Sequence, residues 1–283
     1  MTERVAVVTG ASSGFGLLVT VELAKKGFHV YATMRNLQKS HCISEAVPNE
    51  EVLNNITFFP LDVTKEDSIA SFQNLVGSLD RIDVLVNNAG FAAGGFCEEI
   101  DVNDYRDQFE TNVFGVMAVT QVVLPVMRTR QQGTIINMSS ISGRIGFPGL
   151  SPYVSSKHAL EGYSESLRLE MKPFGVNVAL VEPGSYKTNI WSTGRKVSER
   201  SLQSSSPYQA YMKQLEKQLS TGEKDLGNPL DVANLVVALA EKTTIYKLRH
   251  PIGKGVSMIL RLRSMLTWRS WEKALLKKIN VRL

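Results

Sequence analysis

The stretch VAVVTGASSGFG (5–16) contains the turn that decides the fold. It opens with a short apolar run that ends at Gly10, and further glycines follow at 14 and 16. The next residues, GLLVTVELAKKG (16–27), have the apolar spacing of a helix and end at a glycine. The segment therefore predicts a buried strand, a tight glycine-rich turn and a helix.

The same alternation of strand and helix continues along the chain as far as residue 241. Apolar runs predict strands at 29–35, 55–64, 82–90, 133–140 and 176–184, and helical periodicity predicts helices at 66–79, 101–128, 152–172 and 229–241. Strands that are apolar throughout and alternate with helices are typical of a parallel sheet covered on both faces. The expected fold class is α/β, a doubly wound Rossmann-type sheet with helices on both faces and a C-terminal helical extension.

The pattern divides the chain into one domain and a tail. Residues 1–245 carry the strand–helix alternation, with no repeat, low-complexity tract or linker that would split them. Within this domain, residues 185–225 are rich in Ser, Gln, Lys and Tyr and predict a surface excursion beside the substrate. Residues 246–283 form a basic amphipathic extension, which we expect to pack on the domain.

Composition excludes several classes of protein. The chain has 283 residues, of which 43% are hydrophobic and 21% charged, as in ordinary globular proteins. Its two cysteines and four scattered histidines form no zinc or disulfide pattern, so no metal is expected and a reducing compartment fits best. The start lacks the features of a secretory signal, and no stretch of about 18 uninterrupted apolar residues predicts a spanning helix. We expect a cytoplasmic protein, with peripheral contact to a membrane as a further option.

Charge is concentrated in the tail. The net charge is +5, but residues 246–283 carry ten Lys/Arg and one Glu, a balance of +9, so residues 1–245 carry about −4 (5 minus 9). A nucleic-acid-binding face on the domain is therefore not indicated. The tail segment 256–279 combines Leu, Ile, Met and two tryptophans with basic residues. It can pack on the domain and close the substrate cleft, lie on an anionic membrane surface, or do both.

The glycine-rich turn has the context of a phosphate-binding site. Glycines let the backbone approach a pyrophosphate, and the helix N-terminus supplies free N–H donors and a positive dipole end. The alternative is a tight strand-to-helix corner with no ligand. On the first interpretation, the cofactor would contact Gly10, Ser12, Ser13, Gly14, Phe15 and Gly16.

Four motifs together resemble the short-chain dehydrogenase/reductase family. They are the Gly-x3-Gly-x-Gly spacing of the first turn, NNAG (87–90), TNVFG (111–115) and YVSSK (153–157), and the resemblance extends over about residues 3–190. ATMRN (32–36), GSYKTNIW (184–191) and the long tail also resemble the retinol/hydroxysteroid dehydrogenase branch. The resemblance implies hydride transfer between a nicotinamide and an alcohol or ketone.

The spacing of Tyr153 and Lys157 suggests how the proton moves. Four residues apart on a helix, the two side chains share one face. An ammonium beside the phenol favours the phenolate, as would an oxidised nicotinamide, so we expect the pKa of Tyr153 to lie below its ordinary value near 10. An accidental surface pair is the alternative. The resemblance implies that Lys157 also binds the ribose of the cofactor.

The resemblance assigns two more catalytic residues. Ser140, thirteen residues before Tyr153, would bond the substrate oxygen, with Ser139 as the other candidate. Asn112 interrupts an apolar helical stretch, and its counterpart in the family holds a water that relays protons to the lysine. A plain loop serine and a buried helix-bending asparagine are the structural alternatives.

The end of the second predicted strand favours NADP(H). NAD-preferring sites place a carboxylate there, whereas this chain has Arg35, which could pair with a 2′-phosphate or be a solvated surface residue. Ser13 stands where many NADP-dependent relatives carry a basic residue. The resemblance adds a set of cofactor residues: Asp62 and Val63 beside the adenine, Asn88, Ala89 and Gly90 along the crevice, and Pro183, Gly184 and Thr188 at the nicotinamide.

The residues expected around the substrate are apolar. They are Phe91, Phe96, Ile145, Phe147, Leu150 and Trp191, and they favour a lipophilic substrate of sterol, retinoid, fatty or sphingoid type. A homodimer or homotetramer paired through the helices at 101–128 and 152–172 is implied by the resemblance. The alternatives are a catalytically silent NADP(H)-binding sensor, an NAD-dependent or 3-oxoacyl-type family member, and a membrane-associated module that works through its tail.

Overall fold

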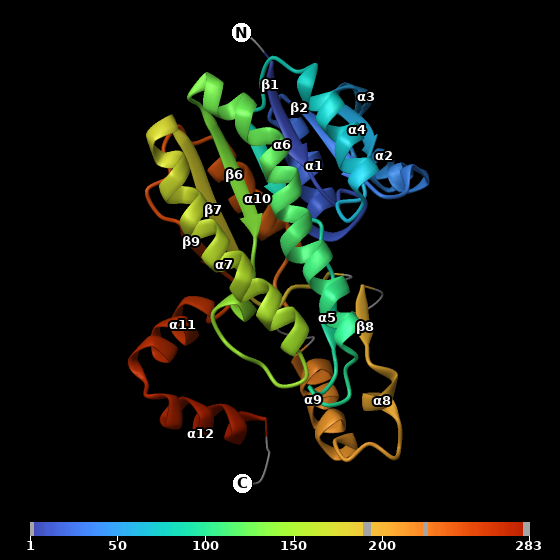
Figure 1. The fold of residues 1–283 in the computed structure, drawn as a ribbon, viewed down its shortest axis with the longest axis vertical. Coiled ribbons are helices and arrows are strands. Elements are labelled where there is room, and N and C mark those ends of the chain that lie inside the picture. The colour runs from blue at the N-terminus through green and yellow to red at the C-terminus, as the bar shows by residue number, and fades with distance from the viewer. Residues whose placement is uncertain (1–2, 189–193, 223–225, 280–283) are drawn as a thin grey trace.

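Seven parallel strands form the centre of the molecule. The computed structural model describes residues 3–188, 194–222 and 226–279 (Figure 1). The strand order is β3-β2-β1-β4-β6-β7-β9, and every neighbouring pair is parallel. The strands are β1 (Arg4–Val8), β2 (Phe28–Met34), β3 (Ile56–Pro60), β4 (Val84–Asn87), β6 (Gly133–Met138), β7 (Val176–Pro183) and β9 (Arg249–Ile252). The chain order reverses between β1 and β4, where such sheets open a crevice, and the predicted doubly wound α/β fold is confirmed.

Helices cover both faces of the sheet. Helices α1 (Gly14–Lys25) and α10 (Pro229–Ala240) pack on one face, and α4 (Glu66–Gly77), α6 (Gly115–Arg130) and α7 (Ser151–Met171) pack on the other. Alternate residues of one strand enter different cores, as Val7 and Val8 of β1 do. The strands read as apolar throughout because both of their faces are buried.

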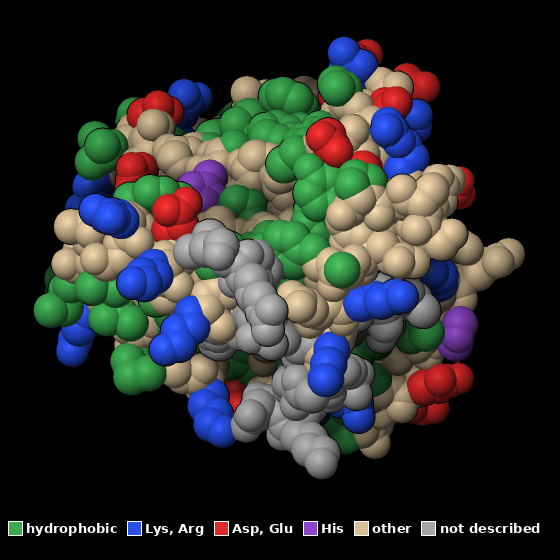
Figure 2. All heavy atoms as spheres, turned by 90° about the horizontal axis from the view of Figure 1, so that it is seen from below, with side chains coloured by type: hydrophobic (Ala, Val, Ile, Leu, Met, Phe, Trp, Pro, Cys, Tyr) green, Lys and Arg blue, Asp and Glu red, His purple; other side chains and the backbone are tan. Residues whose placement is uncertain are grey.

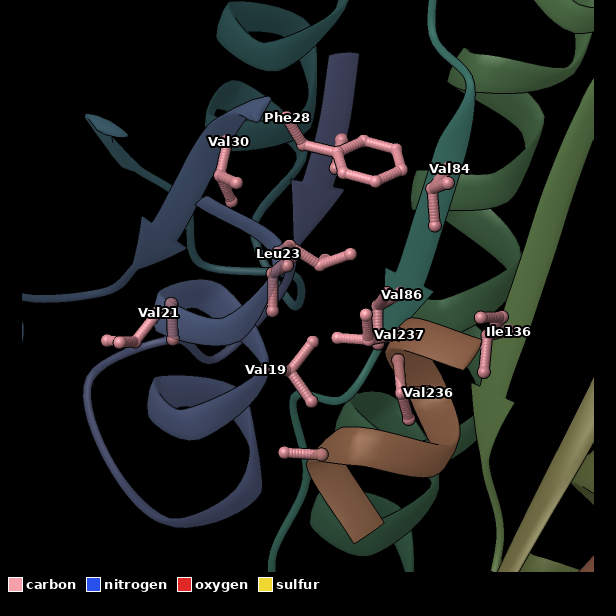
Figure 3. Close-up of a cluster of buried hydrophobic side chains, with 14 of the residues drawn as sticks. Val19, Val21, Leu23, Phe28, Val30, Val84, Val86, Ile136, Val236 and Val237 are labelled. Atoms are coloured by element: carbon pink, nitrogen blue, oxygen red, sulfur yellow. The ribbon is translucent and has the colours of Figure 1, made fainter. Parts of the chain in front are cut away.

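The core under α1 and α10 is tightly enclosed (Figure 3). Leu23 of α1, Phe28 of β2 and Val236 of α10 are each 0% exposed and belong to one cluster with strand residues such as Val86. This cluster fixes the first helix against the sheet. The glycine-rich turn that precedes α1 is thereby held at the carboxyl end of β1.

The predicted helix at 101–128 is divided in the structure. It consists of α5 (Val102–Phe109), a π-helical turn over Glu110–Phe114, and α6. By length and hydropathy the whole run Val102–Arg130 could cross a membrane. However, Val119, Val123 and Met127 are buried against the sheet, so α6, the second half of the run, packs on the core of the domain.

Two segments contain structure that periodicity did not reveal. Residues 37–54 form short helices, namely the 3-10 turn Leu37–Ser40, α2 (His41–Ala46) and α3 (Glu50–Asn54). The expected excursion at 185–225 contains β8 (Arg195–Val197), α8 (Glu199–Leu202) and α9 (Gln209–Gly222), and β8 pairs with β5 (Ala92–Gly94). Its anchors are contacts distant in sequence: the Phe96 ring stacks on Tyr208 with 4.3 Å between centroids.

The sheet extends into the predicted tail. Residues 249–252 were assigned to the extension, but they form β9, the edge strand beside β7. Their sequence, RHPI, is short and half polar, so it carries no strand signal of its own. The remainder of the described tail consists of α11 (Val256–Met265), which packs on β9, and α12 (Trp268–Lys278).

Candidate active site

A cleft opens at the carboxyl ends of the central strands. This is the edge at which open parallel sheets bind their ligands. The cleft brings together nine residues predicted as catalytic or cofactor-binding with Phe91, which was expected beside the substrate, and Ser139, the alternative to Ser140. Met138 and Tyr186 also line it and were not predicted. Its lining residues are Phe15, Asn88, Gly90, Phe91, Met138, Ser139, Ser140, Tyr153, Lys157, Pro183, Gly184, Tyr186 and Thr188.

Tyr153 and Lys157 lie together in this cleft, one helical turn apart on α7. Tyr153 is 4% exposed and Lys157 is 7% exposed. The Lys157 Nζ lies 5.7 Å from the centroid of the Tyr153 ring and donates a hydrogen bond to the Met138 carbonyl at 2.7 Å. The two side chains are therefore not an accidental surface pair.

The predicted depression of the Tyr153 pKa is wrong for the protein alone. Burial raises the pKa of the phenol to about 12, and the hydrogen bond with Ser140 opposes the rise only in part. The charged phenolate loses more hydration in this cleft than its neighbours in the chain restore. At neutral pH the phenol is therefore protonated.

Burial also acts on the amine. It lowers the pKa of Lys157 to about 8, and the negative charge of Glu161 opposes the effect. Glu161 follows Lys157 by one helical turn and is itself 4% exposed. The ammonium form near neutral pH thus depends on a buried carboxylate that was not identified from sequence.

The structure distinguishes the two candidate serines. Ser140 lies in the turn that follows β6. Its hydroxyl accepts a hydrogen bond from the Ser142 N–H at 3.1 Å and is hydrogen-bonded to the Tyr153 phenol. The Ser139 hydroxyl instead donates to Glu161. Ser140 is therefore the serine placed to share a substrate oxygen with Tyr153.

Asn112 lies at the π-helical turn between α5 and α6. Its Oδ1 accepts from the Phe91 N–H at 3.2 Å, and its Nδ2 donates to the Phe91 carbonyl at 3.1 Å and to Ser156 at 3.3 Å. The buried amide is satisfied by these bonds, which tie the cleft wall at Phe91 to the helix that carries Lys157. The turn widens the helix locally, a feature frequent at functional sites.

A hydrogen-bonded latch holds the glycine-rich turn. The Thr9 hydroxyl accepts from the Asn88 and Ala89 N–H groups at 2.9 and 3.0 Å. The Asn88 side chain donates to the carbonyls of Thr9 and Gly10 at 2.9 and 3.1 Å. Gly10 has φ +66°, and a Cβ there would lie 2.8 Å from the Ala89 Cα, so a side chain is excluded. Thr9 was not predicted, because a single threonine at a strand end gives no signal.

The turn can accept a dinucleotide phosphate. Helix α1 starts at Gly14. Within the described part of the chain, the side chain of the residue before it, Ser13, accepts no hydrogen bond from the first N–H groups of the helix. These donors and the positive helix end fit a pyrophosphate. Thr188 reaches this point from beyond β7, since its Cβ lies 3.9 Å from where a Gly14 Cβ would be. Gly16 is buried under the turn, and Ser12 is half-buried beside it.

The residues expected around the adenosine lie just beyond the ends of β2 and β3. The Ala11 N–H donates to the Thr33 carbonyl at 2.9 Å, which places the turn beside the end of β2, and the next residue after β2 is the exposed Arg35. Asp62 accepts from Thr64 through both its backbone N–H and its hydroxyl, as expected of a strand-end turn residue. Val63 packs against Gly115, at which a Cβ would lie 2.6 Å from a Val63 methyl.

The apolar character of the cleft has a partly different source than predicted. Phe91 lines it, but Phe96 and Ile145 are buried in packing, at 6% and 1% exposure. Phe15 and Tyr186 contribute instead, and their rings meet edge to face with 5.7 Å between centroids. Trp191 lies outside the described residues.

The chain resembles known proteins along almost its full length. A family model described as short chain dehydrogenase matches residues 4–198. An oxidoreductase of Bacillus subtilis, YusZ, is 50% identical over 279 residues and 99% of each chain. A 3-ketodihydrosphingosine reductase of Bacteroides thetaiotaomicron is 36% identical over 76% of each chain. An NADPH-dependent 3-dehydrocapnine reductase of Ornithobacterium rhinotracheale is 34% identical over 81% of this chain and 80% of its own.

Solved structures of short-chain dehydrogenase type are similar to this chain as well. A short-chain dehydrogenase from Streptomyces avermitilis has a TM-score of 0.80 and 33% identity, covering 96% of this chain and 97% of its own. The structure of ElxO with NADP bound has a TM-score of 0.74 and 29% identity, covering 91% and 100%.

The pKa of Lys157 predicts a pH dependence of stability. Its folded value of about 8 lies below the ordinary 10.5, so between these values the unfolded chain binds more protons than the folded protein. The contribution of this group to the unfolding free energy must therefore rise with pH from about 8 to 10.5. Urea unfolding of wild type and Lys157→Met from pH 7 to 10 should show a difference that moves in favour of wild type. A pH-independent difference would contradict the assignment.

Proposed function

The chain belongs to the short-chain dehydrogenase/reductase family and is an oxidoreductase that acts on CH-OH groups; we propose that it uses NADP(H) and reduces a lipophilic ketone in the cytoplasm. One observation carries the proposal: the buried phenol of Tyr153 is hydrogen-bonded to Ser140 and has Lys157 beside it in the same cleft. This is the arrangement needed to deliver a proton to a carbonyl oxygen.

The residues divide the work of proton transfer and orientation. When bound, NADP(H) supplies or accepts the hydride at the substrate carbon. Tyr153 donates its proton to the oxygen of the carbonyl, which would otherwise develop negative charge, and Ser140 orients that oxygen. Lys157 places a positive charge beside the phenol and stabilises the phenolate left after the transfer. Asn112 keeps Phe91 and α7 in register, and in the family its counterpart also holds a water on the proton path.

The state of the phenol supports the proposed direction. Burial raises the pKa of Tyr153 to about 12, so the phenol is protonated at neutral pH and can act as the acid that carbonyl reduction requires. Two relatives are named as reductases, one of 3-ketodihydrosphingosine and one of 3-dehydrocapnine, which supports this direction. The apolar groups Phe15, Phe91 and Tyr186 beside Tyr153 favour a substrate with a hydrocarbon part.

The preference for NADP(H) rests on Arg35. This exposed side chain follows β2. Residues 33–39 contain no Asp or Glu that would bind the ribose hydroxyls and repel a 2′-phosphate. A guanidinium there can pair with a 2′-phosphate through two hydrogen bonds. The relative named as NADPH-dependent and the ElxO structure with NADP bound support the same cofactor.

We further propose that the tail contacts an anionic membrane. The outer side of α11 exposes Met258, Leu262 and Met265 at 73%, 46% and 76%, and Trp268 follows at 61%. Exposed basic residues flank these groups, among them Arg261, Arg269 and Lys273. Seen from the end of the molecule that carries α12, the side of the tail shows basic side chains with apolar ones between them (Figure 2). The inner side packs through Val256, which is 4% exposed, so domain packing and membrane contact use different sides of α11.

A homodimer or homotetramer through α6 and α7 is also part of the proposal. Phe114, the last residue of the π-helical turn before α6, is 52% exposed, and Leu169, on α7, is 76% exposed. Both belong to the helical segments through which the family usually pairs. Burying them between copies would remove apolar area from water.

Replacing the phenol tests the reaction. Tyr153→Phe removes the proton donor without changing the ring, so ketone reduction should fall by at least about 100-fold. NADPH binding, measured by the fluorescence of the nucleotide, should persist. A silent sensor or a module that works through its tail would be unaffected by this change, and undiminished turnover would remove the mechanism.

Replacing the guanidinium tests the cofactor. Arg35→Ala should weaken NADPH binding by about 10-fold or more, because charge-assisted hydrogen bonds contribute about 1.5–3 kcal/mol. NADH lacks the 2′-phosphate and should bind almost unchanged. Equal losses for both nucleotides in calorimetric titration would discard the assignment and favour an NAD-dependent enzyme.

Vesicle flotation tests the tail. Wild type should float with vesicles that contain phosphatidylglycerol and not with phosphatidylcholine alone. Arg261→Gln with Arg269→Gln should lower binding by about 30-fold, since each basic residue near an anionic surface contributes about 1 kcal/mol. Lys26→Gln with Lys242→Gln removes the same charge elsewhere on the surface and should leave flotation unchanged. Equal flotation of all three proteins would exclude a docking role for the tail.

A further inference from the structure

A cluster of charged side chains includes Glu161, one helical turn after Lys157 on α7. None of these side chains has a role in the proposed reaction. Glu161 of α7 is 4% exposed and Glu182 of β7 is 0% exposed. Arg249 of β9 reaches both: its Nε lies 2.8 Å from the Glu161 Oε2 and 3.5 Å from the Glu182 Oε1. Arg144, from the turn after β6, lies 3.2 Å from the same Glu182 oxygen.

The two buried carboxylates are unequal. Glu161 is fully engaged, because Ser139 donates to one of its oxygens and Arg249 to the other. Glu182 receives Arg144, but its second oxygen has no hydrogen-bond partner among the described residues. Burial and the neighbouring Glu161 raise the pKa of Glu182 to about 7, against the effect of the two arginines. Glu161 is therefore the better placed of the two to hold a stable negative charge.

The cluster reaches the reacting groups through Glu161. The carboxylate lies one turn from Lys157 on α7, and its negative charge raises the pKa of the amine against the larger effect of burial. The Lys157 ammonium in turn donates to the Met138 carbonyl, next to Ser139 and Ser140. The turn after β6 approaches the cluster closely: a Cβ on Gly143 would lie 2.9 Å from both the Glu161 Cγ and the Ser139 Oγ. No wider side chain fits between them.

We propose that Glu161 is a positioning residue for the proposed reaction: clamped by Arg249 and Ser139, its charge keeps the Lys157 amine protonated and aligned beside Tyr153. The inference rests on the proposed function and deepens it. It also gives β9 a role, because the edge strand supplies the arginine that neutralises and orients the buried carboxylate. Without the negative charge of Glu161, the buried Lys157 ammonium would lose the interaction that offsets its loss of hydration.

The groups that face the cluster define its response to pH. They are Lys157 and Glu165 on α7, Arg144 on the turn after β6, Glu182 on β7 and Arg249 on β9. Glu165 also pairs with Arg249, at 2.6 Å, but its side chain is 55% exposed. Glu165 is therefore a matched control: it has the same partner and charge but no buried contact with the site.

The pH profile of ketone reduction with NADPH is the first test. Glu161→Gln keeps the side-chain size and removes the charge, so the alkaline limb of kcat/KM should move by about one pH unit to lower pH. Glu161→Asp retains the charge and should restore most of the wild-type profile, and Glu165→Gln should match wild type. Coincident limbs for Glu161→Gln and Glu165→Gln in folded, active protein would overturn the proposal.

A second readout needs no substrate. The unfolding free energy of Glu182→Gln and of the double variant Glu182→Gln/Glu161→Gln is measured from pH 6 to 10, with the titration of Glu182 absent from both. The rise that comes from Lys157 should begin about one pH unit lower in the double variant. Identical pH dependence would overturn the proposal. If the wild type reduces no ketone, the proposed function fails, while this second measurement still decides whether Glu161 controls Lys157.

Discussion

Burial of a phenol and an amine on one turn of α7 is the constraint on which the site depends. Loss of water raises the pKa of Tyr153 to about 12 and lowers that of Lys157 to about 8, so burial opposes the charged form of each. The surrounding groups compensate only partly, through Ser140, the Met138 carbonyl and Glu161. The result is a protonated phenol beside an ammonium. The phenol can donate its proton to a carbonyl that enters the cleft.

The fold serves this constraint by bringing distant segments to one edge of the sheet. The latch between Thr9 and Asn88 fixes the glycine-rich turn against the end of β4. The π-helical turn at Asn112 fixes Phe91 against α7. The phosphate-binding turn and the cleft wall beside the reacting groups are therefore held by hydrogen bonds from the side chains of Thr9, Asn88 and Asn112, a rigid arrangement suited to orienting a substrate.

Local signals made much of this predictable. The β1–turn–α1 unit and the Tyr153–Lys157 pair were readable because glycine conformation and helical spacing act over a few residues. Strands β8 and β9 were missed because three or four residues carry no periodicity, and their stability comes from pairing with β5 and β7. The raised pKa of Tyr153 was missed for a related reason. Spacing along a helix reveals the lysine beside the phenol, whereas the packing that removes water is a property of the whole fold.

The central claim is that burial, and not the nearby lysine, sets the state of the phenol in the protein alone. Phenolate absorbance at 295 nm, titrated for wild type and Tyr153→Phe and taken as a difference, measures that state directly. The account predicts no difference signal below pH 10, the ordinary value for tyrosine, in the absence of nucleotide. A difference titration with its midpoint below pH 10 would contradict it.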